Sequence, residues 1–291
     1  MLYLPLQFKP VINRFKKISA LSLTLCAFAI ITFRVFLFSN IGFATSILLS
    51  TVSTTIIGLI VLHMVCPGFD LTPDICLKRK EKLVSLTFDD GPTPGFTDKI
   101  LSILKEHSVC GTFFVLGEKA NLYPSIIMDT ITQGHEVGIH AYKHKKLNWS
   151  GFKEFDFQIA KTDKIVERIC KETDASDNYN KVFRPPNGRK NILLKHYLKK
   201  NGYSLIPWTR EVWDYISPGA VSIIENATKK PASNEIILLH DGLNDLLDVL
   251  DEQKAGLLDA LPQIIEIYKK KGYKFVKASY FLRKNSKHLC S

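Results

Sequence analysis

The 291-residue sequence lacks the cysteine and charge patterns that mark several common protein classes. Its six cysteines are scattered and include no C-x-x-C pair, which excludes a zinc ribbon and a disulfide framework. It has no arginine-rich arm, no zinc-finger spacing and no aromatic–basic pattern of an RNA-binding sheet, so the formal net charge of +11 does not indicate a nucleic-acid partner. We therefore expect free, buried thiols, which fit a reducing compartment, and no nucleic-acid binding.

Charge is nearly absent between residues 18 and 66, where Arg34 is the only formally charged residue. This run is longer than the roughly 7–15 apolar residues of a signal peptide, and a membrane-spanning helix needs about 20. Two such helices fit, at about residues 18–38 and 41–65, with a tight turn at Ser39-Asn40 between them. The sequence therefore predicts a membrane anchor over residues 1–67, a transmembrane helical hairpin in contact with membrane lipid.

The basic residues flank this apolar run on both sides, with nine Lys and Arg against three acids in residues 1–82. Short positively charged flanks stay in the cytoplasm, and the turn carries no charge, so a hairpin keeps both of its ends inside. We expect an integral membrane protein whose downstream domain faces the cytoplasm. The alternative is one long tilted span, with the domain on the external face.

Beyond a linker at residues 68–81, strand-like and helical segments alternate over residues 82–284, before a polar tail at 285–291. Helical spacing occurs, for example, at 96–106 and 152–172. Such alternation predicts an α/β domain with a parallel sheet, but periodicity alone does not separate a small barrel from a doubly wound sheet. The seven strand-like runs are 83–88, 111–116, 135–139, 182–183, 203–207, 235–239 and 273–276.

Two polar clusters follow the first and third of these runs. Asp89 and Asp90 are adjacent, and like charges so close raise one pKa unless a cation is present. A metal ion would take one carboxylate and leave the other as a base. His140 and His144 are four residues apart, which places them on one face of a helical turn, and imidazole is a common zinc ligand. A turn and a surface histidine pair are the structural alternatives.

Two further clusters follow later strand-like runs. Arg184 precedes two prolines, whose rings fix the backbone and suit an arginine held against a carboxylate. His240 ends a buried strand, and its ordinary pKa near 6.5 suits a general acid. A plain loop and a capping histidine are the structural alternatives. All four clusters lie where α/β folds place their sites, at the C-terminal ends of strands.

Together and in this order, the clusters resemble the motifs of the polysaccharide deacetylase family, also called NodB-homology or carbohydrate esterase 4. The resemblance covers residues 82–284 and implies a distorted (β/α) barrel with fewer than eight repeats, which agrees with about seven strands. The matching motifs are T-F-D-D-G at 87–91, H-[ST]-x-x-H at 140–144, R-P-P-Y-G at 184–188, a Trp followed by a D-W pair at Trp208 and Asp214-Tyr215, and L-x-H at 238–240.

The resemblance implies a role for each matched residue. Asp90, His140 and His144 bind a divalent metal, usually zinc. Asp89 is the general base and Arg184 orients it, whereas His240 is the general acid and Asp214 orients it. The substrate pocket is lined by Leu238, Tyr215, Asn187 and Trp208.

Some positions depart from the family pattern, and they leave the substrate open. Ala141 stands where Ser or Thr is usual, which removes a hydroxyl that would brace the metal loop, and Tyr215 stands where Trp is common. The implied function is metal-dependent removal of N-acetyl groups from an N-acetylated sugar, either a polysaccharide or a lipid-linked glycan. Alternatives are a deformylase or amidohydrolase acting on a related lipid-linked aminosugar, and a non-catalytic glycan-binding membrane protein. The last is disfavoured because every metal, acid and base position is filled.

Overall fold

The computed structural model describes residues 51–53, 55–56, 75, 77, 80–147, 150–173, 179–188, 192–216, 219–242 and 252–282. The chain separates into two compact units, Met1–Phe69 and Asp70–Ser291. Except for the helical residues 51–53 and 55–56, the expected spans at 18–38 and 41–65 lie outside the described residues. Among the residues described, none of the helices is both long and apolar enough to span a bilayer. The membrane anchor and the domain boundaries therefore stay predictions.

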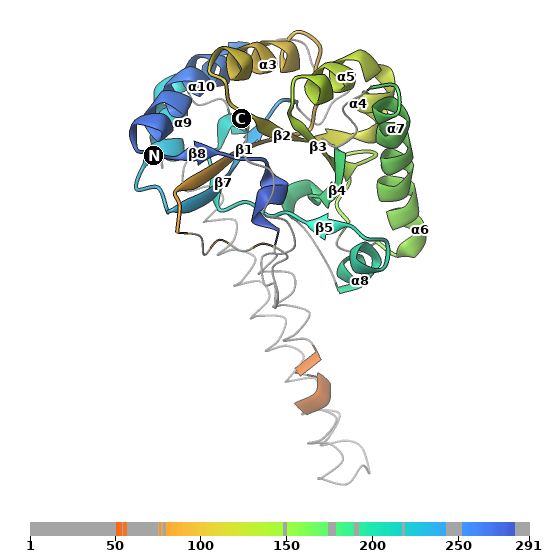
Figure 1. Ribbon diagram of the computed structural model, residues 1–291. Coiled ribbons are helices and arrows are strands. Elements are labelled where there is room, and N and C mark those ends of the chain that lie inside the picture. Colours follow the sequence, from red (N-terminus) through yellow and green to blue (C-terminus); the bar gives the residue numbers. More distant parts are fainter. Residues whose placement is uncertain are drawn as a thin grey trace, which may run out of the picture. The chain divides into compact units, whose positions relative to one another are not determined.

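A parallel sheet forms the centre of the second unit (Figure 1). Its hydrogen-bonded path runs β5-β4-β3-β2-β1-β7-β6, and β8 pairs with the first two residues of β1. Each of the seven expected runs contains a strand, whereas β6 was not expected, because both of its residues are charged and give no apolar signal. The strands are β1 (Leu83–Asp89), β2 (Gly111–Leu116), β3 (Glu136–Ala141), β4 (Tyr179–Phe183), β5 (Ser204–Leu205), β6 (Arg210–Glu211), β7 (Asn234–His240) and β8 (Lys274–Phe275).

The sheet forms a half-barrel rather than a closed one. Its path ends at β5 and β6, and no ladder joins these two strands within the described residues. The short connection between them crosses the opening instead. Ile206 N–H donates to the carbonyl of Phe183 at 2.9 Å, and Thr209 N–H donates to the carbonyl of Ile236 at 2.9 Å. Irregular backbone thus links the two edges, consistent with the distorted barrel that the family resemblance implied.

Helices cover the outer face of the sheet (Figure 1). In α3, for example, Ile100, Leu101 and Leu104 are buried at helical spacing. The single helix expected over 152–172 is interrupted by a π-helical segment, η2 (Asp156–Ala160), a local change of hydrogen bonding that apolar periodicity does not reveal. The helices are α3 (Thr97–Glu106), α4 (Gly117–Leu122), α5 (Pro124–Thr132), α6 (Phe152–Phe155), α7 (Lys161–Cys170), α8 (Ile192–Lys200), α9 (Ala220–Thr228) and α10 (Glu252–Lys270).

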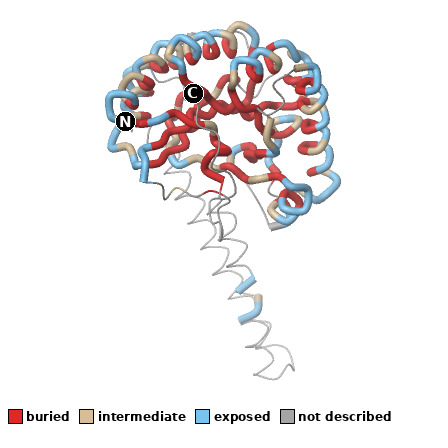
Figure 2. Tube along the Cα trace, viewed as in Figure 1, coloured by how far each residue is buried: buried red, intermediate tan, exposed pale blue. Residues whose placement is uncertain are grey.

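The core has one layer on each face of the sheet. Along β2, Phe113 packs in the layer beneath the helices, and its neighbour Phe114 packs inside the half-barrel. Because both faces are covered, β1, β2 and β3 are buried along their whole length (Figure 2). This rigid centre positions the loops that follow the strands.

Of the two cysteines among the described residues, one differs from the sequence expectation. Cys170 is a buried free thiol, as expected, but Cys110, just before β2, is disulfide-bonded. The expectation of free thiols was therefore wrong for Cys110. Disulfide pairing depends on which cysteines the fold brings together. The spacing of the cysteines along the chain does not predict it.

Candidate active site

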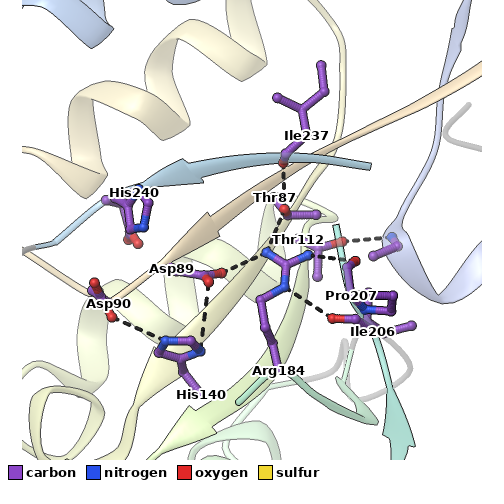
Figure 3. A network of polar contacts seen from close by, with 12 residues as sticks. Thr87, Asp89, Asp90, Thr112, His140, Arg184, Ile206, Pro207, Ile237 and His240 are labelled. Carbon is purple, nitrogen blue, oxygen red and sulfur yellow. Dashed lines mark hydrogen bonds and ion pairs between the residues drawn. The ribbon is translucent and has the colours of Figure 1, made fainter. Parts of the chain in front are cut away.

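The polar clusters meet at the C-terminal ends of the parallel strands. Asp89 and His240 are opposite each other at the ends of the parallel strands β1 and β7. His140 lies one residue before the end of β3, and Arg184 directly follows β4. Since the carboxyl ends of parallel strands face the same way, the four clusters surround a common space, as the sequence predicted (Figure 3).

The three expected metal ligands converge on one point. His140 Nε2 lies 3.3 Å and His144 Nε2 lies 3.4 Å from Asp90 Oδ1. One ligand atom from each of the three residues lies within 4.8 Å of the others. Burial alone would raise the pKa of Asp90, but the neighbouring His140, His144 and His240 lower it to about 2, so the carboxylate is charged at neutral pH.

These residues fit a divalent metal ion. Atoms bonded to a tetrahedral zinc at about 2.0–2.2 Å lie roughly 3.3–3.6 Å from one another, close to the two separations from Asp90 Oδ1. That oxygen is buried and has no hydrogen-bond partner among the described residues. Burial also lowers the pKa of His144, which favours the neutral imidazole that a metal requires. A buried carboxylate oxygen that makes no hydrogen bond and lies between two histidines is the donor set of a cation site.

The expected base, Asp89, is held by a buried arginine. Arg184 Nη1 donates to Asp89 Oδ1 at 2.8 Å, and the arginine side chain has no exposed surface (Figure 3). The second oxygen, Asp89 Oδ2, lies 3.8 Å from His140 Nδ1. One carboxylate oxygen is thus engaged by the arginine, and the other lies on the side of the metal ligands.

Arg184 is itself fixed by the barrel opening. Its Nε donates to the carbonyl of Ile206 at 3.2 Å and its Nη2 to that of Pro207 at 3.3 Å. Nη1 also donates to Thr87 Oγ1 at 2.7 Å, and that hydroxyl donates to the carbonyl of Ile237 at 2.6 Å. The guanidinium therefore links β1 to the connection between β5 and β6, and hydrogen bonds to both fix its orientation toward Asp89.

The expected acid, His240, is held by Asp214. His240 Nδ1 donates to Asp214 Oδ1 at 2.9 Å, and the backbone N–H of His240 donates to Asp214 Oδ2 at 2.8 Å. Burial alone would lower the pKa of His240, but Asp214, Asp90 and Asp89 raise it to about 9. The imidazole is therefore protonated at neutral pH, and Nε2 is the nitrogen left to give a proton.

A further carboxylate, Asp241, to which the sequence patterns assign no role, supports the turn after β1. Asp90 has a positive φ of 75°, and the next N–H, of Gly91, donates to Asp241 Oδ1 at 3.1 Å. Thr97 Oγ1 donates to Asp241 Oδ2 at 2.8 Å. A Cβ on Gly91 would lie only 1.9 Å from Asp241, so glycine is required there. Asp241 follows His240 directly, which is the signal that could have found it.

The cleft between these groups has a volume of about 350 Å³. Its walls include the four expected pocket residues, Gly188 from the motif at 184–188, and Glu211, which sequence reasoning missed. Glu211 accepts a hydrogen bond from the hydroxyl of Tyr215 at 3.1 Å. Arg184 and Asp214 lie behind the walls, so they act through their neighbours. The lining residues are Asp89, Asp90, His140, His144, Asn187, Gly188, Trp208, Glu211, Tyr215, Leu238 and His240.

Gly188 lets an aromatic ring form part of this wall. Its φ is +63°, and a Cβ would lie 2.5 Å from the ring of Trp208. The glycine in the R-P-P-N-G sequence therefore permits both the left-handed turn and the close approach of the indole. The structure places every predicted site residue at or directly behind this cleft; their catalytic roles stay predictions.

Known proteins resemble this chain over the same region. The family model for polysaccharide deacetylases matches residues 77–206. A peptidoglycan-N-acetylglucosamine deacetylase of Bacillus cereus is 32% identical over 207 residues, covering 70% of this chain and 90% of the relative. A chitooligosaccharide deacetylase of Azorhizobium caulinodans is 31% identical over 166 residues, covering 57% of this chain and 77% of the relative.

A solved structure agrees with these sequence matches. The peptidoglycan deacetylase PdaC from Bacillus subtilis matches with a TM-score of 0.58 and 30% identity, covering 69% of this chain and 90% of that one. The matches extend over most of these relatives, and the motif residues of this chain surround one cleft. The chain therefore belongs to the polysaccharide deacetylase family.

Proposed function

We propose that this protein is a metal-dependent hydrolase that removes the acetyl group from N-acetylated sugars of a glycan. Two side chains that line the cleft are each held by a charged partner: Asp89 by Arg184, and His240 by Asp214. This arrangement carries the proposal. Between the two side chains lie the three residues suited to a cation. Such a constellation is what amide hydrolysis needs, because the water must lose a proton and the amine must gain one.

The chain's own residues divide this work. Asp89, oriented by Arg184, takes a proton from the attacking water while the new bond to the acetyl carbon forms. His240 then gives its Nε2 proton to the sugar nitrogen as the carbon–nitrogen bond breaks, which releases acetate and a free amino sugar. An ion held by Asp90, His140 and His144 would supply Lewis-acid polarisation of the acetyl oxygen and of the water.

The relatives support a glycan substrate, and the cleft is compatible with one. Those named above act on peptidoglycan or chitooligosaccharides, both built from N-acetylated sugars. Trp208 and Tyr215 line the cleft, and aromatic faces stack well on sugar rings. We propose an N-acetylglucosamine-containing glycan as substrate and zinc as the metal.

We further propose that the N-terminal apolar segment anchors the protein in a membrane and that the catalytic domain lies on the external face. The support for this orientation is the disulfide at Cys110, because disulfides persist mainly in oxidising compartments. A reporter fused after Ser291 and active on only one side of the membrane tests the orientation. Activity restricted to the cytoplasm would contradict it and would favour a lipid-linked precursor as the substrate.

The activity test uses the purified full-length protein with three substrates: peptidoglycan, a chitooligosaccharide and a lipid-linked N-acetylated sugar. We expect acetate and free amines to appear with the first two, to disappear after treatment with a chelator, and to return when zinc is added. Asp89→Asn is the control, because it preserves the size of the side chain and removes the base. Release of formate from a formylated sugar in place of acetate, or equal turnover by Asp89→Asn, would overturn the proposal.

A further inference from the structure

The turn between the two histidines of the metal site is held by residues outside it. In the described structure, Ala141 contributes only a methyl group there, with a positive φ of 152°. The backbone of the next residue is nevertheless fully engaged. Tyr142 N–H donates to Gln158 Oε1 at 3.1 Å, and its carbonyl accepts from Glu118 N–H, in the first turn of α4, at 3.1 Å. The path from His140 to His144 thus depends on two neighbouring helical segments.

Gln158 makes most of these contacts. The same Oε1 atom also accepts the N–H of Lys143 at 2.8 Å, so one side-chain oxygen binds two successive backbone donors of the turn. Its Nε2 donates to Glu154 Oε1 at 2.9 Å, and that carboxylate accepts Lys145 Nζ at 3.1 Å. Gln158 as a whole residue is 2% exposed. A closed set of hydrogen bonds therefore runs from the turn to Gln158 and Glu154 and back to the residue after His144.

We propose that Gln158 is a positioning residue that holds the His140–His144 turn in the shape required for metal binding, in place of a side chain within the turn. The inference rests on the proposed metal site and adds a residue to it. Groups that fix the ligands of a metal site typically change its affinity by about 10- to 100-fold when they are removed. Gln158 acts on the backbone between the two histidines, so its loss lets them separate.

The π-helical segment explains how Gln158 reaches this position. Gln158 lies within η2, between the α-helical turns α6 and α7, and π-helical turns are frequent at functional sites. The same segment is anchored on its other side, because Tyr197 OH donates to Asp156 Oδ1 at 2.7 Å. Tyr197 therefore offers a matched control, because its hydroxyl makes a part-buried hydrogen bond to the same segment and does not touch the metal turn.

The experiment measures metal affinity on the full-length protein, by competition for zinc with a chromophoric chelator, together with the melting temperature of the metal-free form. Gln158→Met removes all three hydrogen bonds at similar size. Gln158→Glu combined with Glu154→Gln exchanges donor and acceptor in that pair, so both N–H groups keep their acceptor and no second carboxylate is buried beside residue 154. We expect Gln158→Met to weaken zinc binding about 10- to 100-fold. We expect the double variant to stay within about threefold of the unmodified protein, since the retained bonds are those that hold the turn.

The control and the absorption spectrum of bound Co²⁺ separate positioning from general destabilisation. Tyr197→Phe should lower the melting temperature and leave zinc affinity and the Co²⁺ spectrum unchanged, whereas Gln158→Met should change both. Unaltered zinc affinity in Gln158→Met, or an equal loss in Tyr197→Phe, would overturn the proposed role of Gln158 but not the proposed metal site. Failure of the unmodified protein to bind zinc or Co²⁺ would instead overturn the proposed metal site.

Discussion

Replacing Asp214 by asparagine tests whether its charge keeps the catalytic imidazole protonated. Asp214 accepts hydrogen bonds from both Nδ1 and the backbone N–H of His240, at 2.9 and 2.8 Å. Asparagine has the same size and still accepts the backbone bond, but it carries no charge. We therefore expect the protein to fold and the pKa of His240 to fall.

The size of the effect follows from the pKa of His240, which burial lowers but Asp214 and two further carboxylates raise to about 9. A return to the ordinary value of about 6.5 corresponds to roughly 3 kcal/mol in the free energy that favours the protonated form. The protonated fraction near pH 7 would then fall from nearly complete to about a quarter, and lower still where burial acts unopposed. Because the acid-competent form exists below the pKa, the alkaline limit of activity moves to lower pH.

The assay is the pH dependence of kcat/KM for acetate release, which reports the pKa values of the free enzyme. We expect the ratio of unmodified to Asp214→Asn activity to be about 20-fold larger near about pH 8 than near about pH 6, since acid restores the proton on His240. A cation bound near His240 shifts the pKa of this imidazole in the same direction in both proteins. The difference between their two pH profiles therefore remains. A ratio that stays constant across this range would refute the charge argument and leave Asp214 a purely steric support.

Three further substitutions test the other parts of the site. Asp89→Asn should retain zinc, measured by metal analysis, and lose about 10²–10⁴-fold in kcat, as removal of a general base does; unchanged kcat would show that the base is misassigned. His140→Ala should lose bound zinc, measured by the same analysis; normal zinc content would contradict the ligand set. Gly188→Ala introduces a Cβ 2.5 Å from the ring of Trp208 at a φ of +63°, so we expect about 1–3 kcal/mol less stability in denaturant unfolding and a higher KM for oligosaccharides. An unaltered unfolding midpoint and KM would show that the indole moves aside freely.

Local patterns along the chain were sufficient for much of the fold. The apolar runs of β1 and β2 are bounded by turn residues, and both form fully buried strands. Short-range pairs were equally readable: Asp89 with Asp90, and His140 with His144, are close in sequence and fall at strand ends. Such signals need only the period of the strand and the chemistry of the following turn, both of which are local.

Contacts between residues far apart in the sequence could not be predicted from local patterns. The contacts of Arg184 with Asp89 and of Asp214 with His240 were reached through family resemblance, because no spacing rule connects them. Gln158 carries no motif signal by itself. It lies within the stretch 152–172 expected as one helix, and only the folded structure brings its side chain from the π-helical segment to the metal turn.

The sequence by itself determined the alternation of strands and helices, the placement of polar clusters at strand ends and the expectation of an apolar membrane anchor. Only the tertiary structure decided the opening between β5 and β6, the support of the metal turn by Gln158 and the disulfide at Cys110. The physical reason is range. Hydrophobic periodicity and turn chemistry act over a few residues, whereas these contacts exist only after strand order and register have brought distant segments together.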